Sequence, residues 1–90
     1  MTTVGVNLME QIASIVSTEV LKIAQRKIPA LAAVEPQQHL IDDLRLDSLD
    51  IAELVAVLEM ALHRDPFASS LSISDCPTVG KLSEAYSSCA

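Results

Sequence analysis

The chain has 90 residues, half of them apolar, which predicts a single domain over residues 1–90 and excludes a disordered tail. Twelve acidic and six basic residues give a net charge of −6, and only two residues are aromatic, so a nucleic-acid partner is not expected. No basic start precedes an apolar run, and no apolar stretch is long enough to span a membrane, so we expect a cytoplasmic protein without a membrane partner.

The first predicted element is an amphipathic helix over residues 8–25. Its apolar residues recur at steps of three and four, which places them on the side of a helix that faces a core. Asn7 precedes this pattern as a suitable N-cap. The helix is expected to end before Pro29, because the residue before a proline is biased away from helical geometry. The core-facing residues are Leu8, Ile12, Ile15, Val16, Val20 and Ile23.

Residues 29–47 are predicted to form a long loop after this helix, interrupted by Pro29 and Pro36. Loops of this length are uncommon in a small domain and are often functional. We expect the loop to be less protected in hydrogen exchange than the first helix. Its predicted anchors in the core are Leu40, Ile41, Leu44 and Leu46.

The second predicted helix starts at Asp47 or Ser48, either of which is a suitable cap, and runs to about His63. Residues 42–59 hold six acids and one arginine, a net charge of −5, so most of the excess negative charge lies here. One apolar stripe consists of Ile51, Leu54, Val55, Leu58 and Leu62. A second stripe consists of Leu49, Ala52, Ala56 and Met60. A helix that is apolar on two sides is deeply buried or covered by a partner, and a chain this small favours a partner.

The last third of the chain predicts short elements. Asp65 and Pro66 end the second helix, and residues 67–73 hold a short helical turn or a loop. A final helix is expected to be capped by Asp75 or Cys76, with Pro77 in its first turn and an apolar face of Val79, Leu82 and Tyr86. The elements together predict an all-α fold with three main helices, a short additional helix and one aliphatic core.

The candidate for chemistry is the tetrapeptide Asp47-Ser48-Leu49-Asp50, at the junction of the loop and the second helix. A serine at this junction is held at the surface, where the start of the helix offers free backbone N–H groups that favour an attached phosphate. The alternative is that the serine only caps the helix.

Residues 40–55 read Leu-Ile-Asp-Asp-Leu-Arg-Leu-Asp-Ser-Leu-Asp-Ile-Ala-Glu-Leu-Val. This segment resembles the attachment region of acyl carrier proteins. Pro77-Thr78-Val79 at the start of the last helix also resembles that family. The resemblance implies an acyl-carrier-like helical bundle and a monomer without catalytic activity or a metal site. It also implies that Ser48 is esterified by 4′-phosphopantetheine, whose thiol holds acyl intermediates as thioesters for fatty-acid, lipid or polyketide enzymes.

The same resemblance assigns roles to the residues around Ser48. A phosphopantetheinyl transferase installs the arm, and Asp47 matches the acid that assists this step. The resemblance also implies that the partners are acyl-loading and acyl-processing synthases and transferases with basic patches. These patches would contact the helix residues Leu49, Asp50, Ala52, Glu53, Ala56, Glu59 and Met60. Arg45 and Met60 depart from the family pattern, which often has glycine and an acid there, and this predicts a specialised member. Since we expect Arg45 to be exposed, we expect it to influence the choice of partner more than stability.

Two alternatives stay open: a peptidyl or aminoacyl carrier, and a non-enzymatic helical adaptor without a prosthetic group, in which Ser48 is only a cap. A serine hydrolase is disfavoured because the pattern Gly-x-Ser-x-Gly is absent. A zinc site is disfavoured because the spacing of His39, His63, Cys76 and Cys89 matches no known ligand pattern. A calcium loop over residues 42–53 would place leucines at two ligand positions and lacks the required glycine.

Overall fold

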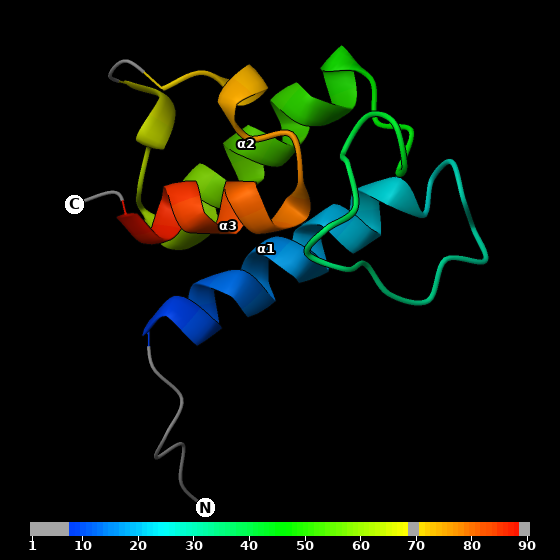
Figure 1. The fold of residues 1–90 in the computed structure, drawn as a ribbon, viewed down its shortest axis with the longest axis horizontal. Coiled ribbons are helices and arrows are strands. Elements are labelled where there is room, and N and C mark those ends of the chain that lie inside the picture. The colour runs from blue at the N-terminus through cyan, green and yellow to red at the C-terminus, as the bar shows by residue number, and fades with distance from the viewer. Residues whose placement is uncertain (1–7, 69–70, 89–90) are drawn as a thin grey trace, which may run out of the picture.

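The computed structural model describes residues 8–68 and 71–88, and over these residues it is helical without a β-strand (Figure 1). The elements in chain order are α1 (Leu8–Ala24), α2 (Ser48–Leu62), the 3₁₀ turns η1 (Pro66–Ala68) and η2 (Ile73–Asp75), and α3 (Val79–Ser88). The predicted all-α bundle is therefore confirmed. The predicted short additional helix takes the form of the two 3₁₀ turns. None of the described helices is long and apolar enough to cross a membrane.

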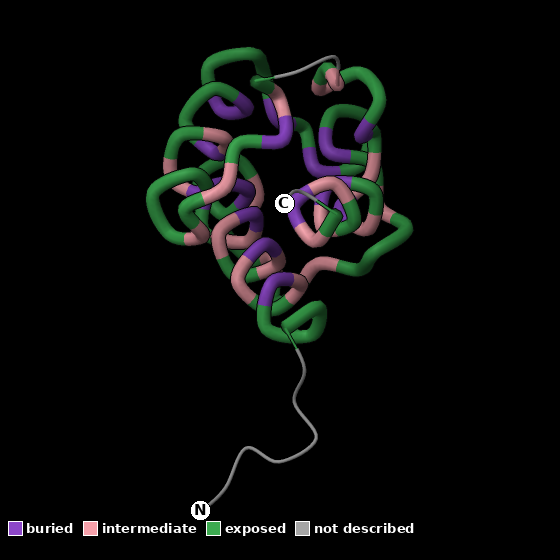
Figure 2. The backbone as a smooth tube through the Cα atoms, turned by 90° about the vertical axis from the view of Figure 1, so that its left-hand side faces the viewer, coloured by how far each residue is buried: buried purple, intermediate pink, exposed green. Residues whose placement is uncertain are grey.

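Helix α1 lies against both α2 and α3 (Figure 1), and its apolar stripe is part of the core. The stripe is buried as predicted at Ile12, Val16, Val20 and Ile23, while Leu8 is exposed. Figure 2 shows that buried positions lie on the inner sides of the helices. The predicted N-cap, Asn7, lies outside the described residues.

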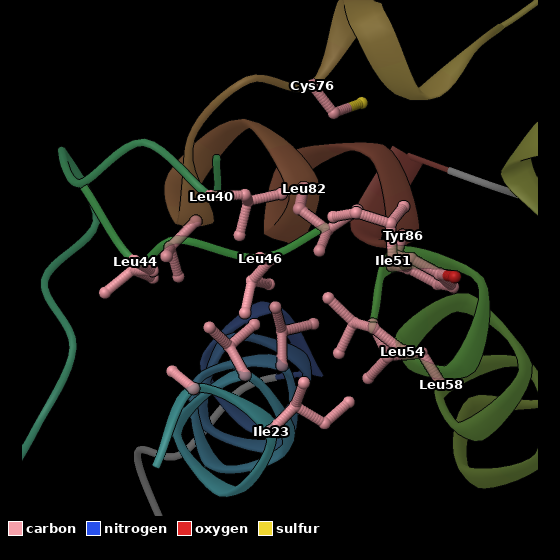
Figure 3. Packing of buried hydrophobic residues seen from close by; sticks show 14 of the residues in the cluster. Ile23, Leu40, Leu44, Leu46, Ile51, Leu54, Leu58, Cys76, Leu82 and Tyr86 are labelled. Carbon is pink, nitrogen blue, oxygen red and sulfur yellow. The ribbon is translucent and has the colours of Figure 1, made fainter. Parts of the chain in front are cut away.

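The long loop contributes three side chains to this core. Leu40, Leu44 and Leu46 are buried, and Figure 3 shows Leu46 directed toward α1. The prediction for Ile41 was wrong, because its side chain is 64% exposed. The reason is a turn in which the N–H groups of Asp43 and Leu44 both donate to the His39 carbonyl, so that the chain coils and residue 41 points outward.

The start of α3 is held by the same loop. The N–H of Gly80 donates to the Pro36 carbonyl at 2.8 Å, and the N–H of Val79 donates to the Gln38 carbonyl at 3.1 Å. A side chain at position 80 would place its Cβ 3.1 Å from the Pro36 oxygen, so glycine permits the close approach. An isolated bridge between His39 and Thr78 continues this pairing.

The predicted cap of α3 at Asp75 or Cys76 was wrong. The Thr78 hydroxyl accepts a hydrogen bond from the Lys81 N–H at 3.1 Å, so the helix begins at Val79 and Pro77 precedes it. Asp75 instead accepts a hydrogen bond from the Ser72 N–H and closes η2.

The described core is almost entirely aliphatic (Figure 3). Tyr86 is its one fully buried aromatic ring, and Phe67 packs edge-on against it with the ring centroids 6.0 Å apart.

Cys76 and Arg64 place polar groups at this core. Cys76 is a buried free thiol, and its burial raises the pKa of that thiol. Arg64 donates to the Tyr86 carbonyl at 3.0 Å, which places a cation at the negative end of the α3 dipole.

Candidate functional site

Ser48 is the first residue of α2, and its side chain is exposed. The N-cap is Asp47, whose Oδ1 accepts from the Asp50 N–H at 2.9 Å. Asp50 reciprocates, since its Oδ2 accepts from the Asp47 N–H at 3.1 Å. This capping box spans the serine and leaves its hydroxyl without a capping role. The idea that Ser48 is only a helix cap therefore does not fit the structure.

Two cations that follow the end of α1, Arg26 and Lys27, contact this capping box. Lys27 Nζ lies 2.8 Å from Asp47 Oδ2 and 2.8 Å from Asp50 Oδ2. The two guanidinium nitrogens of Arg26 lie 3.0 Å from Asp50 Oδ1 and 3.0 Å from Glu53 Oε1. The result is an ion-pair cluster that ties the end of α1 to the first turns of α2.

The cluster keeps its acids ionised. The hydrogen bond from Lys27, supported by the backbone N–H of Asp50, lowers the pKa of Asp47 to about 2. The same ammonium and the Asp47 backbone lower the pKa of Asp50. In return, the two carboxylates raise the pKa of Lys27. The residue before Ser48 therefore carries a full negative charge at neutral pH.

Asp50, which the resemblance implied would meet a partner, is largely buried. Its residue exposure is 9%, and its carboxylate is directed at Arg26 and Lys27. Glu53 is exposed but is paired with Arg26. The remaining acid, Glu59, is exposed, and the neighbouring carboxylate of Asp65 raises its pKa.

The second apolar stripe of α2 lies at the surface. Leu49 is 79% exposed and Met60 is 76% exposed, and both alanines between them are also exposed. We call this stripe, which consists of Leu49, Ala52, Ala56 and Met60, the outer face of α2. Exposed aliphatic side chains in a row are typical of a surface that another molecule covers.

Arg45 is exposed as expected, and its backbone adds a feature that the sequence did not reveal. Its φ angle is 66°, in the left-handed region that favours glycine. Its N–H donates to the Ile41 carbonyl at 3.1 Å, so the residue closes the turn that leads into Leu46 and Asp47. The glycine common at this place in acyl carrier proteins therefore has a conformational reason.

An open apolar groove of about 680 Å³ lies beside Ser48. Apart from Ser48 and Asp47, it is lined by Ile41, Leu46, Ile51, Ala52, Val55, Phe67 and Ile73. A second hollow of about 310 Å³ shares Ile41, Ile51 and Ile73 with the first and extends to Cys76. The groove escaped sequence analysis because it depends on Ile41 facing outward and on η2 folding back toward α2.

These features fit a phosphate ester on Ser48. The hydroxyl is accessible, the start of α2 offers backbone N–H groups and a positive dipole end, and the adjoining groove is apolar. Within residues 8–68 and 71–88, no group of three or more His, Cys, Asp or Glu side chains is placed to hold a metal ion.

Comparison with known proteins gives a family match. A family model described as phosphopantetheine attachment site matches residues 10–86. No curated protein and no solved structure matches the chain.

Proposed function

We propose that this chain, which belongs to the phosphopantetheine attachment site family, carries acyl groups as thioesters on an arm attached to Ser48. Members of this family hold 4′-phosphopantetheine covalently and serve other enzymes as carriers. Bound to the protein, the arm supplies a thiol at the end of a flexible chain, and that thiol holds the cargo.

The observation that carries the assignment to Ser48 is its place in the fold. Its exposed hydroxyl stands at the first turn of a 15-residue helix, between the two members of a capping box. The start of α2 stabilises the negative charge of a phosphodiester, and Asp47 provides an ionised carboxylate on the residue that precedes Ser48. Asp47 is therefore the residue that we propose to assist the transferase.

The groove beside Ser48 favours acyl cargo over aminoacyl or peptidyl cargo. Its lining is apolar except for Ser48 and Asp47, so an aliphatic chain gains by leaving water there. An aminoacyl group carries an ammonium, whose transfer into such a surface is costly without a paired acid, and the one acid in the lining, Asp47, is already paired with Lys27. The groove does not separate fatty-acid, lipid and polyketide pathways, since all of these use acyl thioesters.

We propose that acyl-loading and acyl-processing enzymes dock on the outer face of α2. This face begins next to Ser48, and Glu59 lies at its far end. A carrier must leave each enzyme after every step, which favours a small apolar contact with peripheral charge over a large interface. The net negative charge of the carrier would attract the basic patches of these enzymes and steer their approach.

The test is the intact mass after incubation with coenzyme A, Mg²⁺ and a broad-specificity phosphopantetheinyl transferase. Wild type and Ser14→Ala, which removes an exposed serine of α1, are expected to gain one phosphopantetheine, and Ser48→Ala is expected to gain none. A gain in Ser48→Ala would show that another serine is used. A folded wild type without any gain would favour the adaptor alternative.

A second experiment tests the cargo. The arm is loaded with an octanoyl group or with an aminoacyl group, and hydrogen exchange is compared with that of the unloaded form. We expect the octanoyl form to gain protection at the groove residues Ile41, Ile51 and Ile73 and the aminoacyl form to gain none. The opposite result would favour the peptidyl or aminoacyl carrier.

A further inference from the structure

We propose that Lys27 is a positioning residue for attachment of the arm, because its ammonium holds the residues on both sides of Ser48. The inference rests on the proposed attachment at Ser48. Lys27 lies three residues beyond the end of α1, and the sequence alone assigned it no role.

The contacts of Lys27 surround the serine along the chain. Its Nζ donates to the Arg45 carbonyl oxygen at 3.2 Å, before Ser48, and to Asp47 Oδ2 at 2.8 Å. It also lies 2.8 Å from Asp50 Oδ2, after Ser48. An ammonium has three protons, and these three acceptors match them.

Each contact fixes one part of the turn that presents Ser48. The bond to the Arg45 carbonyl holds a residue whose φ angle of 66° is unfavourable for arginine. The bond to Asp47 Oδ2 holds the carboxylate so that Oδ1 stays on the Asp50 N–H. The Ser48 hydroxyl takes no part in the capping box, so its direction depends on the local backbone. The contacts of Lys27 hold that backbone in place.

The reaction is sensitive to that direction. Ser48 Oγ forms a bond to the phosphorus of coenzyme A that carries the pantetheine arm, and the bond from this phosphorus to adenosine 3′,5′-bisphosphate breaks. The hydroxyl proton passes to water or to a base of the transferase. Because a nucleophile misplaced by about 1 Å can slow a reaction by about 100-fold, we expect Lys27→Met to lower kcat about tenfold.

Arg26 provides the matched control. It carries the same charge, adjoins Lys27, and also pairs with two acids of α2, Asp50 and Glu53. Within the described part of the chain, its side-chain hydrogen bonds and ion pairs reach neither Arg45 nor Asp47. A purely structural or long-range electrostatic role would therefore give Arg26→Met and Lys27→Met similar kinetics.

The experiment measures steady-state attachment by intact mass, with coenzyme A, Mg²⁺ and a broad-specificity transferase, while the carrier concentration is varied. We expect Lys27→Met to lose kcat with little change in KM for the carrier, Arg26→Met to lose much less kcat, and Lys27→Arg to recover most of the loss. Circular dichroism checks that each variant is helical. If Lys27→Met is unfolded at the assay temperature, Lys27→Gln replaces it with the same expectation.

Four results would overturn the proposal. Equal kcat for the Lys27 and Arg26 variants, or a change confined to KM, would show that Lys27 does not position the serine. A wild type that gains no arm would overturn the attachment at Ser48 and this inference with it, whereas normal modification of every variant would overturn the inference alone.

Discussion

Replacing Arg45 by glycine is expected to stabilise the protein, although a charged side chain is lost. Arg45 has a φ angle of 66°, and its side chain is exposed, whereas its two hydrogen bonds are made by the backbone. Glycine keeps both backbone bonds and has no Cβ to oppose a left-handed conformation. Exposure alone predicted a larger effect on partners than on stability, and the backbone angle adds an expected effect on stability.

The size of the effect comes from two opposing terms. The left-handed conformation costs a residue with a Cβ about 1–2 kcal/mol. Replacing arginine by glycine removes this cost. The greater freedom of glycine in the unfolded chain offsets about 0.4–1 kcal/mol of the resulting gain in stability. The expected net stabilisation of Arg45→Gly is therefore about 1 kcal/mol, which in a domain of this size raises Tm by about 4–8 °C.

The assay is urea and thermal unfolding of wild type, Arg45→Gly and Arg45→Ala, followed by circular dichroism. Arg45→Ala removes the same charge and side chain but keeps a Cβ at the left-handed position, so the difference between the two variants isolates the backbone. We expect the alanine variant to be no more stable than wild type. Equal stability of the glycine and alanine variants would refute the reasoning.

Four further outcomes are expected. Wild type should lose stability as the pH falls from 3.8, the ordinary pKa of Asp47, toward its folded value of about 2, because the lowered pKa means that the ionised form stabilises the fold. Lys27→Met should lose less stability over this range. Urea unfolding midpoints at each pH measure the difference. Leu54→Ala, at a fully buried position, should cost about 2–5 kcal/mol in urea unfolding, whereas Leu49→Ala should stay within about 0.5 kcal/mol. Thr78→Ala should cost about 1 kcal/mol in the same assay, because the Lys81 N–H loses its acceptor. Ile73→Asp should leave arm attachment unchanged but remove the octanoyl-induced protection from hydrogen exchange, and unchanged protection would show that the chain lies elsewhere.

Local patterns predicted the parts of the fold that depend on local chemistry. The three- and four-residue spacing of Ile12, Val16, Val20 and Ile23 requires one buried face, and α1 follows it nearly to the residue. Asp47 and Asp50 are three residues apart, the spacing of a capping box, so the start of α2 was accessible to sequence reasoning. The motif around Ser48 predicted it as the attachment site.

The parts that sequence reasoning missed depend on contacts between distant residues. Lys27 meets Asp47 across 20 positions, and no spacing rule connects the two. The resemblance implied that Asp50 meets a partner, and nothing in the sequence indicated its pairing with Arg26 and Lys27, which accounts for its burial. Ile41 was expected in the core because it is apolar, but the turn around it reverses the direction of its side chain.

The pairing of the long loop with the start of α3 has a consequence for how the chain folds. Helix α3 has ten residues, which is too short to be stable alone in water, and its first N–H groups donate to carbonyls of the loop. His39 and Thr78 are 39 positions apart, so this closure must wait until a long chain segment has been brought together. Helices α1 and α2 are longer, with 17 and 15 residues, and we expect α3 and the loop to become ordered together, after them, as one cooperative unit.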